Sequence, residues 1–268
     1  MVSIVYMVAG LSSRFNGKLK ALAKISKDES LIEYSLNQAL PAGFDKIVFI
    51  VSNKTKPFFQ EKFGESYKNI PIQYALQNYD STKRDKPWGT LDALCSANHL
   101  LNEPFVICNG DDLYGKNTFK TLFNHLKSNQ NNEAVTVGYY LKEVLPNEGW
   151  VNRGIFKIDN SHILKINEVL GISKYNLEEK KLDLNNLCSM NIFGLFPSSL
   201  EKLNQILKEF KQKNQGEKTN ECFLPVELSS LINSNELKMK IYPTEDNWYG
   251  ITNPGDEIII QKKLEENS

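Results

Sequence analysis

Continuous apolar runs alternate with helical patterns through the first half of the chain, and this alternation constrains the fold more than any other feature. The runs typical of strands buried on both faces span residues 2–8, 45–52, 70–76, 104–112 and 133–141. Helical patterns lie between them, beginning near residues 30, 55, 89 and 116. Strands that alternate with helices pair in parallel, so the pattern predicts a doubly wound α/β sheet.

The second half of the chain follows a different pattern. Its predicted elements are a hairpin of 154–158 and 161–169 that turns at Asp159-Asn160, a strand at 189–196, a helix from Pro197, a strand at 236–243 and a closing helix. A hairpin cannot join parallel strands, so we expect the sheet to be mixed. We expect one domain over residues 1–268, Rossmann-like, with a small α+β subregion appended.

Charge and composition limit the partners of this chain. Its 32 basic and 32 acidic residues cancel, so no global field favours nucleic acid or an anionic membrane. No apolar stretch approaches the roughly 20 residues that span a bilayer, and no signal-peptide pattern opens the chain. The four cysteines form no CxxC pair, which favours free thiols in a reducing compartment. We expect a cytoplasmic protein; the sequence leaves homo-oligomer formation open.

An anion site is indicated directly after the first predicted strand. The stretch MVAGLSSRFNGKLKAL, residues 7–22, carries three closely spaced cations, Arg14, Lys18 and Lys20. Cations placed this closely repel one another unless an anion lies among them. The small residues of the same loop let backbone N–H groups approach a phosphate, and an arginine can grip it bidentately. The loop therefore predicts phosphate binding, with a basic surface turn as the alternative.

Two further loops carry residues suited to chemistry. In KPWGTLDAL, residues 86–94, Gly89 and Thr90 lie where a helix begins and its N–H groups are unpaired, although this is also an ordinary helix start. In CNGDDLYG, residues 108–115, two adjacent carboxylates follow a buried strand. Such a pair is unfavourable unless a cation joins it, and Mg²⁺ takes one or two carboxylates together with phosphate oxygens. The loop at residues 108–115 therefore predicts a metal site, with a turn and an N-cap aspartate as the alternative.

The order of the motifs resembles that of a known family. VAGLSSRF, LKAL, PWGTLDA, NGDDLYG, INEV, NIFGLF, ECFLP and WYGITNPGDE occur in the order seen in the sugar-phosphate nucleotidyltransferases, the nucleotide-sugar pyrophosphorylases. The resemblance implies a glycosyltransferase-A-like nucleotidyltransferase fold, with a nucleotide-binding half at 1–145 and a sugar-phosphate-binding half at 146–268. It implies that a nucleoside triphosphate, UTP or dTTP first, is coupled to a sugar 1-phosphate with release of pyrophosphate and with Mg²⁺ as cofactor.

The resemblance also implies roles for single residues. Catalytic roles fall on Arg14, Lys20 and Asp111, and Asp111 would hold the metal. Residues that would bind the nucleotide are Ala9, Gly10, Leu11, Ser12, Ser13, Gln77, Gly89 and Thr90. Residues that would bind the sugar phosphate are Asp112, Gly154, Glu168 and Asn191.

Two positions depart from the family's motifs. Val169 occupies the place of the lysine that usually follows the glutamate matched by Glu168, so the family's second cation is absent or supplied elsewhere. Gly250 occupies the place of an aspartate that binds metal in many relatives. Asp246 or Asn253 is the candidate for the second metal ligand.

Other functions remain open at this point. The same features suit a cytidylyltransferase that acts on a small phospho-alcohol such as phosphocholine. A glycosyltransferase of the same fold would need a D-x-D or similar pair, whereas this chain has D-D at Asp111 and Asp112. A non-catalytic ligand-binding regulator is disfavoured because Arg14, Lys20 and Asp111 are all present. The sequence does not choose between UTP, dTTP and CTP.

Overall fold

The computed structural model describes residues 1–10, 19–129 and 131–266. Its main sheet contains β1 Ser3–Met7, β2 Lys46–Val51, β3 Ser66–Tyr67, β4 Ile70–Leu76, β5 Phe105–Asn109, β7 Ala134–Tyr140, β8 Val151–Asp159, β9 His162–Ile172, β10 Leu187–Ser189, β11 Phe193–Leu195 and β12 Met239–Thr244. A separate two-stranded pair consists of β6 Asp112–Leu113 and β13 Tyr249–Gly250. The helices are α1 Leu31–Ala39, α2 Lys56–Phe63, α3 Thr90–Ser96, α4 Lys116–Ser128, α5 Leu141–Val144, α6 Pro197–Lys213, α7 Leu224–Asn233 and α8 Asp256–Glu266.

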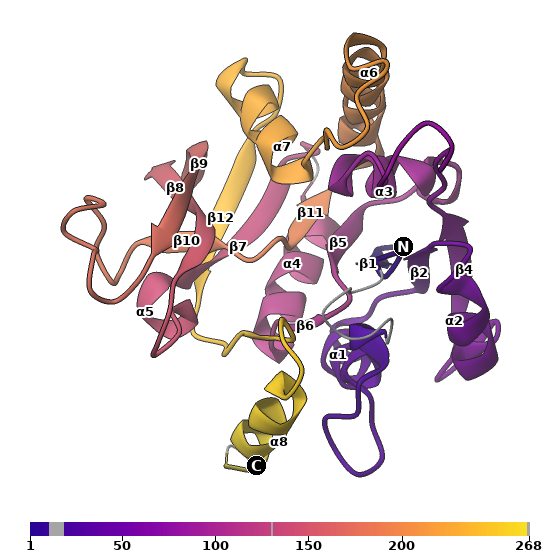
Figure 1. The fold of residues 1–268 in the computed structure, drawn as a ribbon, viewed down its shortest axis with the longest axis horizontal. Helices are drawn as coiled ribbons and strands as arrows, with labels where there is room; N and C mark the ends of the chain where they lie inside the picture. Colours follow the sequence, from indigo (N-terminus) through magenta and orange to yellow (C-terminus); the bar gives the residue numbers. More distant parts are fainter. Residues whose placement is uncertain (11–18, 130, 267–268) are drawn as a thin grey trace.

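The main sheet is mixed, as expected. In the described residues its 11 strands run in the order β10-β8-β9-β12-β7-β11-β5-β1-β2-β4-β3 (Figure 1). Strands β4, β2, β1 and β5 pair in parallel, whereas β11 joins β5 to β7 through antiparallel ladders on both of its sides. The α/β class and the mixed Rossmann-like sheet predicted from the sequence are confirmed.

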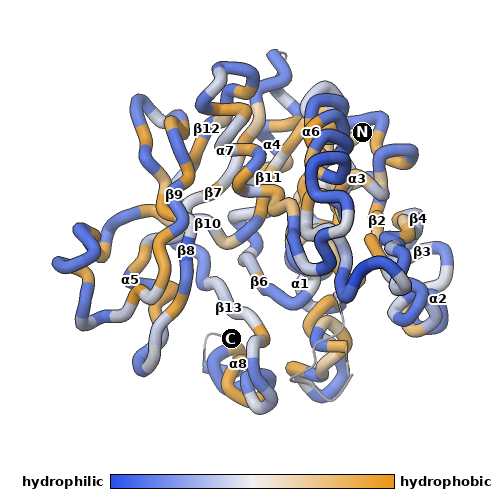
Figure 2. The backbone as a smooth tube through the Cα atoms, turned by 45° about the horizontal axis from the view of Figure 1, so that its top comes forward, coloured by the Kyte–Doolittle hydropathy of each residue, from blue (hydrophilic) through white to orange (hydrophobic). Residues whose placement is uncertain are grey.

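Helices cover both faces of this sheet because its central strands are apolar on both sides. In β1, Ile4 and Tyr6 enter one hydrophobic cluster and Val5 enters another. The first cluster also contains buried side chains of α1, α2 and α4, and the second contains those of α3, α6 and α7. In Figure 2 hydrophobic residues lie along β2 and β11, and the residues of α6 are largely hydrophilic on the side that faces the viewer.

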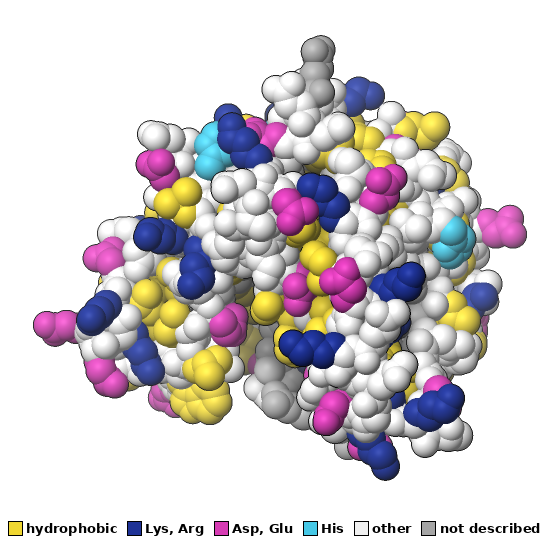
Figure 3. All heavy atoms as spheres, turned by 90° about the horizontal axis from the view of Figure 1, so that it is seen from above, with side chains coloured by type: hydrophobic (Ala, Val, Ile, Leu, Met, Phe, Trp, Pro, Cys, Tyr) yellow, Lys and Arg dark blue, Asp and Glu magenta, His cyan; other side chains and the backbone are white. Residues whose placement is uncertain are grey.

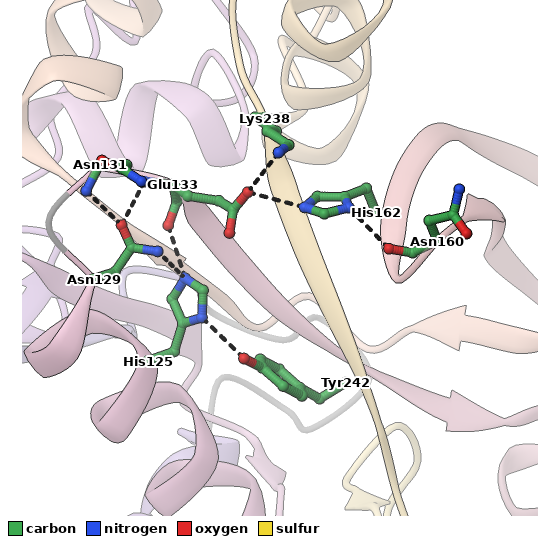
Figure 4. Close-up of polar contacts among 8 residues, drawn as sticks. All are labelled: His125, Asn129, Asn131, Glu133, Asn160, His162, Lys238 and Tyr242. Atoms are coloured by element: carbon green, nitrogen blue, oxygen red, sulfur yellow. Dashed lines mark hydrogen bonds and ion pairs between the residues drawn. The ribbon is translucent and has the colours of Figure 1, made fainter.

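The predicted hairpin forms with a turn one residue later than expected. Asp159 pairs with His162, so the turn residues are Asn160 and Ser161, with φ angles of 46° and 64°. A two-residue turn of this kind needs positive φ at both central positions, which places the turn after Asp159. The hairpin end contacts the residue directly before β7, since His162 Nε2 lies 2.9 Å from Glu133 Oε1 (Figure 4).

Two other predicted elements differ in detail. The single strand expected at 189–196 is divided into β10 and β11 by a turn in which Asn191 has a φ of 58°. The sequence pattern also gave no helix at 224–233, where α7 packs against β9 and α3. The strand expected at 104–112 ends at Asn109, and Asp111 lies in the turn that follows it.

The parallel pairing of β1 and β5 brings two of the predicted loops together. Met7 and Asn109 are register partners at the carboxyl ends of the two strands. The backbones then stay close, because Gly110 N–H donates to the Met7 carbonyl at 3.1 Å. A Cβ at Gly110 would lie 2.2 Å from Val8 Cγ1, so only glycine permits this approach. Ligands of doubly wound sheets bind at this edge.

The surface and helices agree with the balanced charge of the chain. On the face seen in Figure 3, basic and acidic side chains are interspersed, without a large field of one sign. In the described parts of the chain, none of the helices has the length and apolar character needed to cross a membrane.

Candidate active site

Lys20 and Asp111 lie where two cavities meet. Lys20 begins a 3₁₀ helix, Lys20–Leu22, and Asp111 follows β5. Lys20 Nζ is 3.6 Å from Asp111 Oδ2, and the two side chains are 19% and 37% exposed. Both residues line both cavities. Lys20 and Asp111 are therefore within reach of a group bound in either cavity.

The first cavity, here called the β1 cavity, has a volume of about 240 Å³. Its described lining residues are Met7, Val8, Gly10, Leu19, Lys20, Ala21, Phe59, Gly110 and Asp111. It therefore lies beside the loop in which the sequence predicts phosphate binding. Ala9 lies between the lining residues Val8 and Gly10 in the chain. Leu11, Ser12, Ser13 and Arg14 lie outside the described residues.

The second cavity, here called the hairpin cavity, also has a volume of about 240 Å³. It brings together six predicted site residues, Lys20, Asp111, Asp112, Gly154, Glu168 and Asn191. Residues that the sequence reasoning did not select complete the lining: Asn109, Asn152, Arg153, Ser189, Met190, Trp248, Ile251 and Thr252. Gly154 of β8 and Glu168 of β9 are direct register partners.

Asp112 is a buried carboxylate held by its neighbours. Asn109 Nδ2 donates to Asp112 Oδ2 at 2.9 Å, and the Tyr114 hydroxyl lies 3.1 Å from the same oxygen. Burial, followed by the charge of Asp111, raises the pKa of Asp112 to about 7. Burial also raises the pKa of Asp111, although the charge of Lys20 opposes that shift. The two carboxyls therefore repel each other, and a cation placed between them and a phosphate would be favourable.

Arg153 is the cation that sequence reasoning missed. Its Nη1 donates to the Asn152 carbonyl at 3.1 Å and its Nη2 to the Val144 carbonyl at 3.3 Å. Burial lowers the pKa of Arg153, and the charges of Asp112 and Glu168 oppose that shift. Burial in turn raises the pKa of Glu168, against the charge of Arg153. The sequence signal that could have identified Arg153 is its place directly before Gly154, the first residue of the predicted strand at 154–158.

The two candidates for a second metal ligand lie elsewhere. Asp246 Oδ2 accepts a hydrogen bond from Thr118 N at 2.6 Å and its Oδ1 accepts from Asn117 Nδ2 at 2.9 Å, so it caps the start of α4. Asn253 N donates to Asp256 Oδ2 at 2.7 Å. Neither residue is part of the described lining of the hairpin cavity.

Gly250 has no room for the aspartate that the family resemblance implies at this position. It pairs with Asp112 across β13 and β6, and an added Cβ would lie 2.5 Å from Asp112 Oδ1 and 2.5 Å from Trp248 Cζ2. Among the described residues, no group of three or more His, Cys, Asp and Glu side chains surrounds a metal position. Asp111, partly exposed between the two cavities, fits an Mg²⁺ ion whose other ligands are phosphate oxygens and water.

The predicted base-binding residues form a packed cluster of their own. Gln77 is buried, and its Nε2 donates to Asp92 Oδ2 at 2.9 Å and to the Gly89 carbonyl at 3.1 Å. Gly89 has a φ of 98°, and a Cβ there would lie 2.5 Å from the Cys222 carbonyl oxygen. Thr90 Oγ1 accepts a hydrogen bond from Leu224 N at 2.9 Å. These contacts fix the start of α3 against the start of α7.

Comparisons with solved structures find the same fold in several enzymes. A Bacillus anthracis protein assigned as a glucose-1-phosphate thymidylyltransferase, in complex with sucrose, matches with a TM-score of 0.70 at 14% identity, over 98% of this chain and 95% of its own. CTP:phosphocholine cytidylyltransferase from Streptococcus pneumoniae matches with a TM-score of 0.66 at 15% identity, over 98% and 99%. UDP-glucose pyrophosphorylase complexed with UDP-glucose gives 0.67 at 17%, over 100% of both chains.

Sequence comparisons give one further result. No curated protein matches this chain. The model of the family described as nucleotidyl transferase matches residues 15–224, which is most of the chain and includes Lys20, Asp111 and Glu168. Together with the mixed α/β fold and the paired cavities, this match identifies the protein as a member of the nucleotidyl transferase family.

Proposed function

We propose that this nucleotidyltransferase couples a nucleoside triphosphate, UTP or dTTP first, to a sugar 1-phosphate and releases pyrophosphate. The observation that carries the proposal is the Lys20–Asp111 pair, which lines both the β1 cavity and the hairpin cavity. Transfer between two anionic substrates needs a shared electropositive point at which their phosphates meet. Lys20 supplies such a point directly, and Asp111 would supply one through a bound Mg²⁺.

In this proposal each cavity takes one substrate. The triphosphate binds in the β1 cavity and along the loop that runs from Ala9 through Leu11, Ser12 and Ser13 to Arg14, with residues 1–145 as the nucleotide-binding half. Gln77, Gly89 and Thr90 lie beside the nucleobase. The acceptor binds in the hairpin cavity, against residues of the half at 146–268.

The chemistry follows from this arrangement. A phosphate oxygen of the acceptor attacks the α-phosphorus of the triphosphate, the bond from that phosphorus to the bridging β-oxygen breaks, and pyrophosphate leaves with the electron pair. The acceptor phosphate is already anionic, so no general base is required. Lys20 and Arg14 stabilise the charge that develops on the phosphates. Mg²⁺, held by Asp111 and phosphate oxygens, would supply further charge neutralisation.

The hairpin cavity favours a sugar over a quaternary amine as the acceptor body. Its lining contains side chains that hydrogen-bond to hydroxyl groups, namely Asn109, Asn152, Glu168, Ser189, Asn191 and Thr252. Quaternary ammonium groups are recognised by cages of several aromatic rings. Among the described lining residues Trp248 is the single aromatic one. Phosphocholine, the substrate named for the Streptococcus pneumoniae enzyme, is therefore the second candidate.

Pyrophosphate release over a matrix of substrates tests the proposal. UTP, dTTP and CTP are each combined with glucose 1-phosphate, other hexose 1-phosphates and phosphocholine, with and without Mg²⁺. We expect Mg²⁺-dependent release with a sugar 1-phosphate. If pyrophosphate is released only with the pair of CTP and phosphocholine, the acceptor is the phospho-alcohol and not a sugar 1-phosphate. If no pair of substrates gives pyrophosphate, the proposed function is contradicted.

A further inference from the structure

The hairpin cavity contains a partly buried cation, Arg153, that forms no ion pair with a described carboxylate. Its carboxylates are Asp111, Asp112 and Glu168, and its cations are Lys20 and Arg153. Lys20 has Asp111 within ion-pair distance. Arg153 has no carboxylate within that distance in the parts of the chain that the structure describes, and its two described hydrogen bonds go to backbone carbonyls.

The guanidinium of Arg153 is also incompletely hydrogen-bonded. Its Nε is buried and has no partner among the described residues. Its Cζ lies 5.4 Å from the centre of the Trp248 ring, which shields one side of the cation from water. A buried N–H group without a hydrogen-bond partner is costly, and a phosphate oxygen that accepts from the Arg153 Nε–H offsets that cost. An arginine is suited to a phosphate because its N–H groups match two phosphate oxygens.

The strand register places Arg153 of β8 directly opposite Val169 of β9. Side chains of directly opposed residues in an antiparallel pair project from the same face of the sheet. Val169 is the position at which the family resemblance implies a lysine, and here it is a half-buried apolar side chain packed against the core.

We propose that Arg153 binds the phosphate of the acceptor and that it replaces, from the opposite strand, the cation absent at Val169. The inference rests on the proposed function, because it assigns this phosphate to the substrate that enters the hairpin cavity. It makes Arg153 the residue that selects a phosphorylated acceptor over the free sugar. Glu168, paired with Gly154 next to it, contacts hydroxyl groups of the same acceptor.

Steady-state kinetics of Arg153→Gln test this assignment. The acceptor and triphosphate are the pair that the wild-type enzyme uses in the substrate matrix, with glucose 1-phosphate as the first acceptor. We expect the KM for the acceptor to rise at least about tenfold, with the KM for the triphosphate unchanged. Arg153→Lys should be intermediate, because lysine keeps the charge and loses the two-point contact.

A rescue variant separates phosphate binding from a structural role. Arg153→Gln combined with Val169→Lys returns a cation to the opposite strand, so we expect the acceptor KM to fall back toward the wild-type value. The control is Lys157→Gln, which removes an exposed cation of the same strand that pairs with Lys165. It should leave both KM values unchanged. Thermal melting of every variant reports whether the hairpin remains folded.

Three outcomes would overturn the inference. They are an acceptor KM that stays at the wild-type value in Arg153→Gln, an equal rise of both KM values, and a double variant no better than Arg153→Gln. Each requires a wild-type enzyme that releases pyrophosphate. A wild-type enzyme inactive with every pair instead contradicts the proposed function, so the two failures are distinguishable.

Discussion

Lys20 Nζ lies 3.6 Å from Asp111 Oδ2, and this pair lines both the cavity beside the first loop and the cavity beneath the β8–β9 hairpin. The two residues come from segments that lie far apart in the sequence, and the parallel pairing of β1 with β5 brings those segments together. The predictions below follow from this meeting point and from the contacts that surround it.

Lys20→Ala should lower turnover far more than stability. The ammonium pairs with Asp111 at a partly exposed position outside the core, and removal of one charge-stabilising contact lowers the rate by about 100- to 1,000-fold. The measurement is kcat together with the melting temperature. Lys24→Ala, an exposed lysine four residues later, is the matched control and should behave as wild type. Turnover near the wild-type rate in Lys20→Ala would remove Lys20 from the mechanism.

The adjacent carboxylates should differ in their effect on activity. Asp111→Asn should abolish Mg²⁺-dependent turnover, because Asp111 is the partly exposed carboxylate between the two cavities. Asp112→Asn should leave a measurable fraction, because Asp112 is buried against Asn109 and Tyr114, where asparagine keeps the shape. Turnover is measured against Mg²⁺ concentration. Equal losses in two folded variants would mean that the pair binds metal jointly.

Asp246→Ala should act on stability. The carboxylate caps α4 through Thr118 N and Asn117 Nδ2, and Gly115 before the helix has no side chain to replace it. Loss of such a cap lowers the free energy of unfolding by about 1 to 2 kcal/mol. Denaturant unfolding measures this change, with the exposed neighbour Glu245→Ala as control. A stable Asp246→Ala variant that needs much more Mg²⁺ would instead identify Asp246 as a metal ligand.

Glu133→Gln should lower stability in a pH-dependent way. Burial disfavours ionisation of Glu133, but His162 and Lys238 outweigh it and lower the pKa of the carboxyl (Figure 4). Because the pKa is lower in the folded state, the ionised pair stabilises the protein above the unfolded value of 4.5 and loses its effect as the pH falls through the folded value. The wild-type melting temperature should exceed that of Glu133→Gln at about pH 6, and the difference should shrink toward about pH 3.

The matched control for this prediction is Glu143→Gln. Glu143 is about half exposed and lies 4.0 Å from Lys142, so its ion pair is largely screened by water. Its melting temperature should follow the wild type across the same pH range. The melting temperatures of wild type and Glu133→Gln should not differ by a constant or growing amount as the pH falls toward about pH 3. Such a result would contradict a stabilising ion pair at Glu133.

Much of the fold was predictable because it depends on local pattern. The apolar run at 2–8 contains β1, and the helix expected to begin near residue 116 begins at Lys116 in α4. The sequence analysis missed α7, Leu224–Asn233, although its buried residues Leu224, Leu228, Leu231 and Ile232 follow the spacing of one helix face. The hairpin turn moved by one residue because backbone φ at Asn160 and Ser161, which composition alone does not reveal, decides its place.

The candidate site was predictable in part for a related reason. Asp111 follows β5 and Asn191 follows β10, and loops at the ends of neighbouring strands come together; Glu168 lies within β9 and reaches the same cavity from there. Arg153 was missed because its partner, Val169, is known only from the pairing of β8 with β9. Register depends on the turn and on packing across the sheet, which a single sequence does not determine.

The fate of a labelled acceptor phosphate tests the central claim most directly. Glucose 1-phosphate carrying ³²P is incubated with enzyme, Mg²⁺ and the triphosphate that gives pyrophosphate in the substrate matrix, and the products are separated. If the acceptor's phosphate attacks the α-phosphorus, the label is found in the nucleotide sugar and the pyrophosphate is unlabelled. Label released as inorganic phosphate, or label that stays in glucose 1-phosphate while the triphosphate is consumed, would contradict nucleotidyl transfer to the acceptor.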